Sequence, residues 1–447
     1  MANGTAKITR TFGTPTDRDK WTWSAWVKIA DTQEQGLFFG YIDANNYTHI
    51  EASSTGQFKI YNHLAGVNNA NVRSSNLMRD PSAFYHLVVV WDSGNATEAD
   101  RVKMYINGVE IEYTSTTYPG QNDNSSINGN NLHEVGAKLG GYGFAGVMSH
   151  VQFVDGLALA PTDFGSFDST SGIWKIKTSC YATPGNNGFC LKMEDSSNLD
   201  LDSSSNANTF TTVGTLTATK DNPSNNFATF NPLQNYIPAH TFSNGNDTIT
   251  TTNASETYSM STMGVSAGKW YFEALLDAST YSIYSQIGIA AAPGRATGDY
   301  IGQETWAYGT GFDNTGGYRQ SGSATAYGNT WTGGDYLGCY MDLDNNKVYF
   351  AINGVIQNSG TGISITAAAN TTGYGNYFFC IGDRHSDDSI WYCNFGNGYF
   401  GTTAIGSPEA DVGGIGAFKY DPSAGTFDGS SKDFRALCTK NIKAYGG

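Results

Sequence analysis

The chain has few charged side chains, and the positive ones are the scarcer kind. Only 15% of its 447 residues are charged, with 25 Lys and Arg against 40 Asp and Glu, which gives a formal net charge of −15. Binding to phosphates or to an anionic membrane surface needs clustered Lys and Arg. We therefore expect no nucleic-acid partner and no electrostatic attachment to a membrane.

Long apolar runs and a leader pattern are also missing. No stretch reaches the roughly 18 apolar residues that a membrane-spanning helix needs. Residues 1–5 lack the basic and apolar segments of a signal peptide. We expect no membrane insertion, and synthesis in a cytoplasm without a signal peptide.

Cysteine is too sparse for a disulfide framework, because there are 6 in the whole chain and none has C-x-x-C spacing. Cys180 and Cys190 flank a turn, and Cys380 and Cys393 are spaced to lie on neighbouring strands. Either pair could therefore come close, but cytosolic synthesis favours reduced thiols. We expect no structural zinc, and buried reduced cysteines rather than disulfides.

What the sequence does contain favours strands. Aromatic residues make up 13% and there are 54 glycines, among many Asn, Ser and Thr residues, a mixture typical of short strands joined by turns. In residues 20–28 the alternation places Trp21, Trp23 and Val27 on one face of a strand. We therefore expect an all-β protein.

Two segments predict tight hairpins. In residues 102–111 and 347–356, alternating runs meet at Asn107-Gly108 and Asn353-Gly354. Asn-Gly tolerates the positive φ angles that a two-residue type I′ turn requires. Because the polar stretch 195–235 lies between these hairpins, we expect two sandwiches, one on each side of a connector.

Residues 1–170 resemble a laminin-G-like domain, and residues 236–407 resemble a SPRY domain. The first resemblance rests on segments 23–27, 86–90, 103–111 and 144–151, and the second on segments 268–273, 287–290, 338–344, 347–355 and 393–396. They imply two concanavalin A-like antiparallel β-sandwich (jelly-roll) domains. Residues 171–235 would supply closing strands and an irregular polar connector, and residues 408–447 a tail in which segment 434–438 can dock.

The order of these parts is similar to that of bacteriophage structural proteins, with further matching segments at residues 10–16, 221–233 and 436–439. The resemblance implies a fibre, tail or capsid-surface protein of the virion, made in the cytoplasm of the bacterial host. Its partners would be other virion proteins, further copies of itself, and a host-surface glycan or receptor. The alternatives are a purely architectural protein that decorates or cements a capsid or tail and, more distantly, a secreted glycan-degrading enzyme.

Three patterns that match enzyme motifs lack the context that catalysis requires. Residues 141–146 match G-x-G-x-x-G and residues 264–268 match G-x-S-x-G, but each precedes an expected strand rather than a helix. Glu110 and Glu112 alternate on a strand, but on a face that we expect to be solvated. The seven histidines are scattered without zinc spacing. We expect no catalytic residues and a non-enzymatic protein.

Two groups of residues are candidates for binding. The first consists of aromatic residues among Gly, Asn, Ser and Thr, namely Trp306, Tyr308, Tyr318, Tyr327 and Trp331. Rigid aromatics among small polar residues are typical of binding surfaces, although the same rings could instead belong to a core. The second consists of weak Ca²⁺ candidates in two loops, Asp92 and Asp100 in one and Asp342 and Asp344 in the other. No other cofactor is expected.

Overall fold

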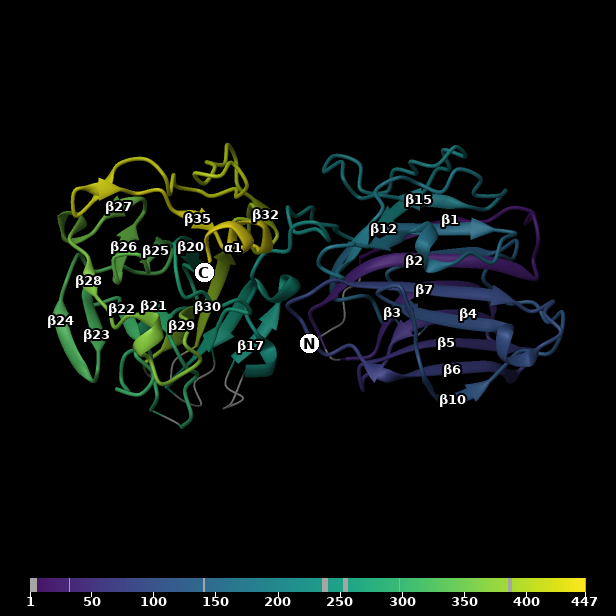
Figure 1. Cartoon of the computed structure of the whole chain (residues 1–447), viewed down its shortest axis with the longest axis horizontal. Helices are drawn as coiled ribbons and strands as arrows, with labels where there is room; N and C mark the ends of the chain where they lie inside the picture. The colour runs from purple at the N-terminus through teal and green to yellow at the C-terminus, as the bar shows by residue number, and fades with distance from the viewer. Residues whose placement is uncertain are drawn as a thin grey trace. The chain divides into compact units, whose positions relative to one another are not determined.

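The computed structural model describes residues 6–31, 33–139, 141–234, 240–251, 256–296, 298–384 and 388–446. The chain divides into two compact units, residues 1–218 with 222–224 and residues 219–221 with 225–447 (Figure 1). The predicted start of the second domain at residue 236 lies outside the described residues. Within them, no helix is long and apolar enough to cross a membrane.

The first unit has two main antiparallel sheets. The eight-stranded sheet has the order β10-β6-β5-β4-β3-β11-β1-β16, and the six-stranded sheet has the order β15-β12-β2-β7-β8-β9. The strands of the larger sheet are β1 (Lys7–Thr11), β3 (Gln35–Asp43), β4 (Asn46–Ala52), β5 (Gln57–Leu64), β6 (Val67–Leu77), β10 (Tyr113–Thr117), β11 (Leu132–Val135) and β16 (Thr211–Val213). Those of the smaller sheet are β2 (Lys20–Ile29), β7 (Tyr85–Asp92), β8 (Val102–Ile106), β9 (Val109–Glu110), β12 (Gly146–Asp155) and β15 (Phe189–Leu191). A hairpin, β13 (Gly165–Phe167) with β14 (Trp174–Ile176), and the 3-10 turns η1 (Glu98–Asp100) and η2 (Pro161–Asp163) complete the unit.

The second unit repeats this plan. Its nine-stranded sheet follows the order β17-β18-β30-β20-β25-β26-β27, with β28 beside β26 and β35 beside β20, and its six-stranded sheet follows β19-β29-β21-β22-β23-β24. The first sheet comprises β17 (His240–Ser243), β18 (Thr248–Thr251), β20 (Lys269–Leu276), β25 (Tyr336–Asp342), β26 (Lys347–Ile352), β27 (Val355–Ile356), β28 (Ile363–Ser364), β30 (Ser389–Asn394) and β35 (Arg435–Ala436). The second comprises β19 (Thr257–Met260), β21 (Ser285–Ala290), β22 (Thr310–Asp313), β23 (Gly317–Gln320), β24 (Ser323–Ala326) and β29 (Phe378–Asp383). Smaller elements are β31 (Tyr399–Phe400), β32 (Thr403–Ala404), β33 (Thr426–Phe427), β34 (Ser430–Ser431), η3 (Pro232–Gln234), η4 (Asn244–Asn246), η5 (Asn358–Gly360), η6 (Ala368–Asn370) and α1 (Thr439–Tyr445).

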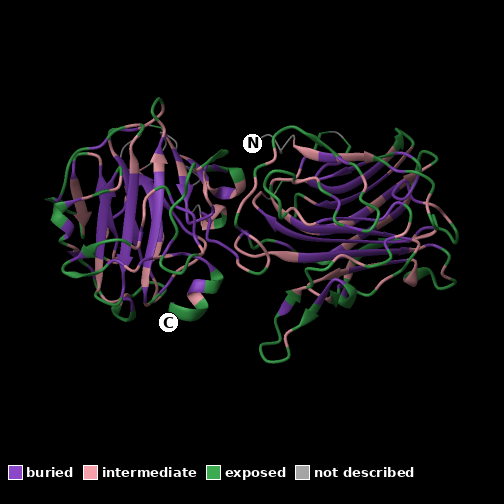
Figure 2. Ribbon diagram, turned by 90° about the horizontal axis from the view of Figure 1, so that it is seen from above, coloured by how far each residue is buried: buried purple, intermediate pink, exposed green. Residues whose placement is uncertain are grey.

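The alternation of side chains along the strands builds the cores, and the all-β fold class is confirmed. On β2, Trp21, Trp23 and Val27 all point into the core of the first unit, as the sequence predicted. Figure 2 shows the consequence in both units, since the strands are largely buried and the connecting loops exposed. The two Asn-Gly turns are also confirmed. Asn107 and Gly108 have φ angles of 50° and 81°, and Asn353 and Gly354 of 49° and 78°.

The outer face of the six-stranded sheet in the first unit is covered by the chain that follows β12. Thr22 Oγ1 donates a hydrogen bond to the carbonyl of Leu157 at 2.8 Å. Further along, Trp174 Nε1 donates to Nδ1 of His86 at 3.0 Å, and Ser24 Oγ lies 2.9 Å from Nε2 of the same ring. This covering leaves the outer face of the eight-stranded sheet as the broad uncovered sheet face of this unit among the described residues.

The segment after residue 408 docks on the second unit rather than trailing from it. β35 pairs in parallel with β20, and Phe434 and Leu437 are buried, as expected for segment 434–438. The carboxylate of Glu273 on β20 accepts hydrogen bonds from the backbone N–H of Lys419 at 2.7 Å and from Asn394 Nδ2 at 2.8 Å. Burial raises the pKa of Glu273 to about 7, although these donors lower it.

The cysteines differ from the expectation of reduced thiols in one place. Cys180 and Cys190 form a disulfide, with Cα atoms 5.8 Å apart. Cys380 and Cys393 are free, because β29 and β30 belong to different sheets. The turn between Cys180 and Cys190 brings the pair together once β15 has joined β12, a contact that the spacing alone could not decide.

The first unit extends beyond residue 170, where the sequence motifs placed the end of the first domain. β15 and β16 follow residue 170 and join β12 and β1 of the first unit. Of the polar segment after residue 218, residues 222–224 still belong to the first unit. Residues 219–221 and those from 225 on belong to the second unit, where Phe227 pairs with Cys438 and Phe230 with Ser261. The connector is therefore ordered along its described part.

We expect the first unit to lose stability as the pH falls below about 6.5, because of His86. An indole N–H only donates, so Nδ1 of His86 must accept and the ring must be neutral. Burial lowers the pKa of His86 to about 3. Between these two pH values the unfolded state binds a proton that the folded state excludes, so stability is lost at up to about 1.4 kcal/mol per pH unit.

Urea unfolding of the whole chain between pH 7 and pH 4.5 would measure this slope. His86→Gln is the comparison, because its amide can accept from Trp174 and donate to Ser24 without titrating. His133, whose pKa burial also lowers to about 3, contributes equally in both proteins. The variant should show the shallower slope, and identical slopes would show that His86 is protonated in the folded state.

Candidate functional site

The structure separates the five predicted aromatic site residues into two groups. Tyr327 and Trp331 belong to the core of the second unit, with exposures of 7% and 4%. The Trp331 ring packs against Phe312 and Trp391, with ring centroids 6.1 and 5.9 Å away. Tyr327 and Trp331 are therefore core residues and do not form the expected binding surface, because their rings pack against other core rings.

The other three are half-buried. Tyr308 and Tyr318 pack against the same core, while the guanidinium carbon of Arg295 lies 4.0 Å from the centroid of the Trp306 ring. One face of Trp306 is thus occupied by a cation. A shallow open depression of about 550 Å³ lies beside Tyr327, lined by residues 326–329 and 355–359. In this depression, the side-chain amide oxygen of Gln357 already accepts a hydrogen bond from the backbone N–H of Asn329 at 2.8 Å.

The predicted calcium ligands are engaged with protein donors. Asp100 pairs with Lys103 at 3.1 Å, and Asp92 lies 3.5 Å from the ammonium of Lys20. Asp342 accepts two hydrogen bonds from Asn345, and Asp344 accepts one from the N–H of Gly268. Across the described ranges, no group of three or more His, Cys, Asp or Glu residues could hold a metal ion. The calcium hypothesis gains no support from these contacts.

The enzyme-like motifs sit where the sequence placed them. Residues 141–146 lead into strand β12, and residues 264–268 lead into strand β20, so neither precedes a helix. Glu110 lies 3.7 Å from Lys103 with 46% of its side chain exposed. None of these segments has the strand-to-helix turn that a phosphate-binding loop or a nucleophile elbow requires.

A different set of residues lies on the outer face of the eight-stranded sheet. Four strands, β3 to β6, carry an alternating pattern in which every second residue points away from the core, and the register aligns these residues into rows across the sheet. One row is Phe39, His49, Tyr61 and Asn71, the next is Tyr41, Tyr47, His63 and Asn68, and the third is Glu51, Lys59 and Arg73. Neighbouring strands therefore assemble one continuous surface.

The rings of the first two rows form a stack that we call the ring ladder, composed of Phe39, Tyr41, Tyr47, His49, Tyr61 and His63. The centroids of Tyr47 and His63 are 4.9 Å apart and those of His49 and Tyr61 are 5.1 Å apart, with interplanar angles of 26° and 14°. The rings thus turn their faces to one another. Since side chains stand roughly perpendicular to a sheet, ring edges and polar atoms point outward.

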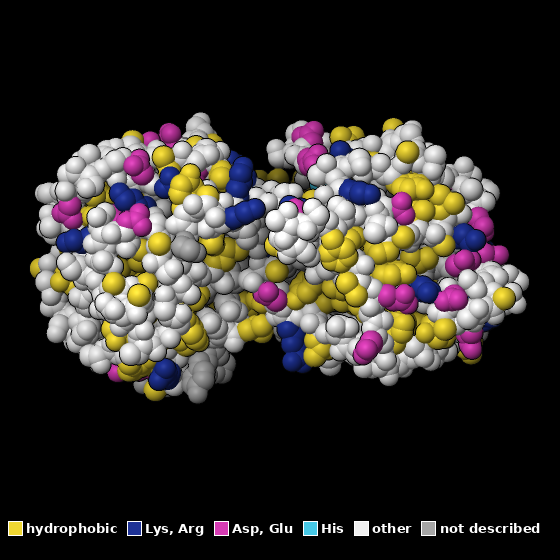
Figure 3. All heavy atoms as spheres, viewed as in Figure 1, with side chains coloured by type: hydrophobic (Ala, Val, Ile, Leu, Met, Phe, Trp, Pro, Cys, Tyr) yellow, Lys and Arg dark blue, Asp and Glu magenta, His cyan; other side chains and the backbone are white. Residues whose placement is uncertain are grey.

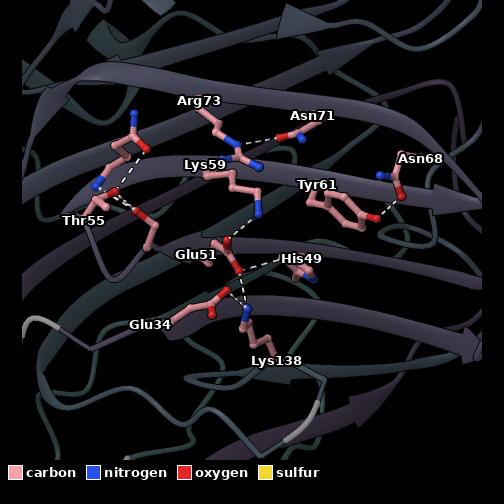
Figure 4. A network of polar contacts seen from close by, with 12 residues as sticks. Glu34, His49, Glu51, Thr55, Lys59, Tyr61, Asn68, Asn71, Arg73 and Lys138 are labelled. Atoms are coloured by element: carbon pink, nitrogen blue, oxygen red, sulfur yellow. Dashed lines mark hydrogen bonds and ion pairs between the residues drawn. The ribbon is translucent and has the colours of Figure 1, made fainter. Parts of the chain in front are cut away.

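The third row belongs to a group of ionic residues that we call the Glu51 cluster, shown in Figure 4 and composed of Glu34, His49, Glu51, Lys59, Arg73 and Lys138. Glu51 is completely buried and binds Lys59 at 2.7 Å and Lys138 at 2.5 Å. Burial alone would raise the pKa of Glu51, but His49 and the two lysines lower it overall. Lys138 also binds Glu34. Glu51 is therefore an ionised anchor that fixes two cations.

His49 joins the ladder to this cluster and retains unused hydrogen-bonding capacity. Its side chain is 9% exposed, and burial lowers its pKa while Glu51 raises it. Nε2 lies 3.1 Å from Oε2 of Glu51, within ion-pair range. Nδ1 is buried as well and has no hydrogen-bond partner among the described residues. A buried polar atom without a partner is costly, so this ring carries an energetic cost in the protein as it stands.

Sequence reasoning missed this surface, although one signal for it was present. Alternation places Tyr47, His49 and Glu51 on one face of a strand, but it does not show which residues of the next strand lie beside them. The histidines are scattered in the sequence, whereas the register places His49 and His63 next to Tyr47 on one face. Alternating aromatic and ionic residues on two consecutive strands were the signal that could have found it.

Comparison with known proteins identifies both domains. A model described as the concanavalin A-like lectin/glucanases superfamily (Laminin_G_3) matches residues 3–163, and a model of the SPRY domain matches residues 269–381. The chain therefore contains one domain of each kind, and domains of these kinds often bind carbohydrates or proteins. No curated protein sequence matches the chain.

Solved structures with similar parts include the human HERC1 SPRY domain, at 15% identity over 37% of this chain and 96% of that one, with a TM-score of 0.28. Domains LG4-5 of the mouse laminin alpha1 chain share 8% identity over 98% of this chain and 84% of that one, with a TM-score of 0.29. Domain 4 of AbnA, an extracellular arabinanase from Geobacillus stearothermophilus solved with arabinotriose, shares 21% over 32% and 64%, with a TM-score of 0.24. At these TM-scores no property of those proteins transfers to this chain.

Truncation of the two tryptophans should give opposite results. Trp331→Ala should destabilise the second unit by about 3–5 kcal/mol, as expected when a buried aromatic is removed. Trp270→Ala is the positive control, because Trp270 is completely buried. Trp306→Ala should cost much less, because its ring is only half-buried. Thermal unfolding of the full chain measures all three, and an unchanged transition in Trp331→Ala would return that ring to the list of ligand-binding candidates.

Proposed function

We propose that the chain is a non-enzymatic binding protein whose first unit holds a glycan on the ring ladder. The observation that carries this proposal is a sheet face whose outward atoms are hydroxyl, imidazole and amide groups over stacked rings. Tyr61 donates to Asn68 Oδ1, and Nδ1 of His63 lies 3.1 Å from the same oxygen. Such groups both donate and accept, which matches the hydroxyls of a sugar.

The state of the carboxylates supports binding rather than hydrolysis. Glycoside hydrolysis uses two carboxyl groups, of which one must be protonated to act as an acid. On this face Glu51 is held ionised by two lysines, and Glu34 shares Lys138 with it. A carboxylate fixed between cations is a poor proton donor. The match to a superfamily described by both lectins and glucanases is compatible with either activity, and the ion-paired carboxylates are what supports binding.

We further propose that the protein is located on the surface of a virion. The order of its sequence segments resembles bacteriophage structural proteins, which supports a position on the virion surface and attachment to a host-surface glycan or receptor. A single shallow sugar site binds weakly, and repetition of the chain on one particle would raise the overall affinity. On the face of the molecule that Figure 3 shows, acidic and basic groups are scattered among uncharged side chains, which is compatible with a ligand rich in hydroxyl groups.

Binding of the purified chain to a glycan array tests the site. Tyr61→Ala should lower the affinity for the captured glycan at least about tenfold, because it removes a hydroxyl and opens the ring stack. Tyr105→Ala is the matched control, since Tyr105 is also half-buried on a strand but lies on the six-stranded sheet. An array without any bound glycan, or equal losses in the two variants, would contradict the proposed site.

The virion position has its own test. An antibody raised against the chain should label intact bacteriophage particles from a lysate in which the chain is made, and mass spectrometry should find it in density-purified particles. Recovery of the chain only in the soluble fraction, with unlabelled particles, would contradict the position on the virion while leaving glycan binding open to the array.

A further inference from the structure

One cation on the candidate glycan face has no anionic partner. Arg73 on β6 donates from Nε to Oδ1 of Asn71 at 3.0 Å. Among the residues that the structure describes, no carboxylate lies within ion-pair distance of its guanidinium, and its side chain is half-buried rather than fully solvated. The two terminal nitrogens of the guanidinium thus remain available to a ligand.

The neighbour of Arg73 makes this arrangement unfavourable in the absence of an anion. Arg73 and Lys59 are direct cross-strand partners, and Figure 4 shows the two side chains next to each other. Like charges opposite each other on a sheet are destabilising. Within the described part of the chain, the carboxylate bound to Lys59 is that of Glu51, which Lys138 shares.

The charges of the Glu51 cluster also leave one cation without a matching anion. Its lysine and arginine cations are Lys59, Arg73 and Lys138, and its carboxylates are Glu34 and Glu51. Three positive and two negative charges leave one positive charge. This surplus lies in a protein whose overall net charge is −15, so it is a local feature of this face.

We propose that the ligand of this face is an acidic glycan, whose carboxylate or sulfate group binds Arg73 while neighbouring sugar hydroxyls contact the ring ladder. This inference rests on the proposed glycan-binding function and adds the chemical class of the glycan. A guanidinium has a planar fork of donors that matches both anions in two-point contact.

The spacing on the sheet places an anion site beside the ring ladder. Arg73 and Asn71 are separated by two residues on β6, which is about 7 Å along a strand. Asn71 lies in the same row as Tyr61. A sugar carrying its acidic group over Arg73 would therefore place its hydroxyls over that row. Lys59, fixed by Glu51 at 2.7 Å, supports the anion from the side.

Calorimetric titration of the full chain with three oligosaccharides of equal length tests this inference. The probes are a neutral oligogalactan, an oligogalacturonate and a sulfated oligogalactan. We expect one of the acidic probes to bind at least about tenfold more tightly than the neutral one, and raising the salt from 0.05 to about 0.5 M to remove most of the difference through screening. The better acidic probe identifies the anion as carboxylate or sulfate.

Arg73→Gln should lower the affinity for the acidic probe about ten- to hundredfold, as expected for a lost hydrogen bond to a charged group, and leave the neutral probe unchanged. Arg79→Gln is the matched control, because Arg79 is an exposed arginine just beyond the end of β6. Thermal unfolding of both variants would show that the fold is intact.

The possible failures are distinguishable. Equal binding of neutral and acidic probes, or equal effects of Arg73→Gln and Arg79→Gln, would overturn the acidic-glycan inference and leave the proposed function in place. Absence of binding to all three probes and to the glycan array would overturn the proposed function, and the inference with it.

Discussion

Side chains alternate between two faces along every strand, so each sheet of a sandwich presents an outer face that must be covered or made polar. The first unit does both. On its six-stranded sheet, the chain after β12 covers the outer face and buries His86 between Ser24 and Trp174. On its eight-stranded sheet the outer face carries the ring ladder and the Glu51 cluster. The candidate site lies there because the other outer face is occupied.

The same alternation decided how much of the molecule could be predicted from its sequence. The faces of β2 and the two Asn-Gly turns depend on neighbouring residues, and local patterns predicted them correctly. The ring ladder depends on the register between β3, β4 and β5, which is a non-local property. Tyr47 and His63 lie on the consecutive strands β4 and β5 and become neighbours only through that register. Local reasoning therefore found the strands but not the surface they form.

In the aromatic segment 306–331, by contrast, the sequence predicted a binding surface where the structure has core residues. Its composition resembled a binding surface, yet Trp331 and Tyr327 fill the core of the second unit beside Phe312. Glycine-rich segments between short strands place large rings in the core as readily as on the surface, and composition does not distinguish the two. The cysteine pair at residues 180 and 190 was equally ambiguous, since only the pairing of β15 with β12 brings the two sulfurs together.

The parallel pairing of β35 with β20 has a consequence for synthesis of the chain. Glu273 is made early in the second unit, but two of its hydrogen-bond donors, the N–H groups of Lys419 and Tyr420, follow about 150 residues later. At the usual rate of roughly 5–20 residues per second, a ribosome needs on the order of ten seconds to supply them. Throughout that interval a buried carboxylate and the aromatic rings around it remain open to water. The second unit therefore completes the hydrogen bonds of Glu273 only after the segment with Lys419 and Tyr420 has left the ribosome.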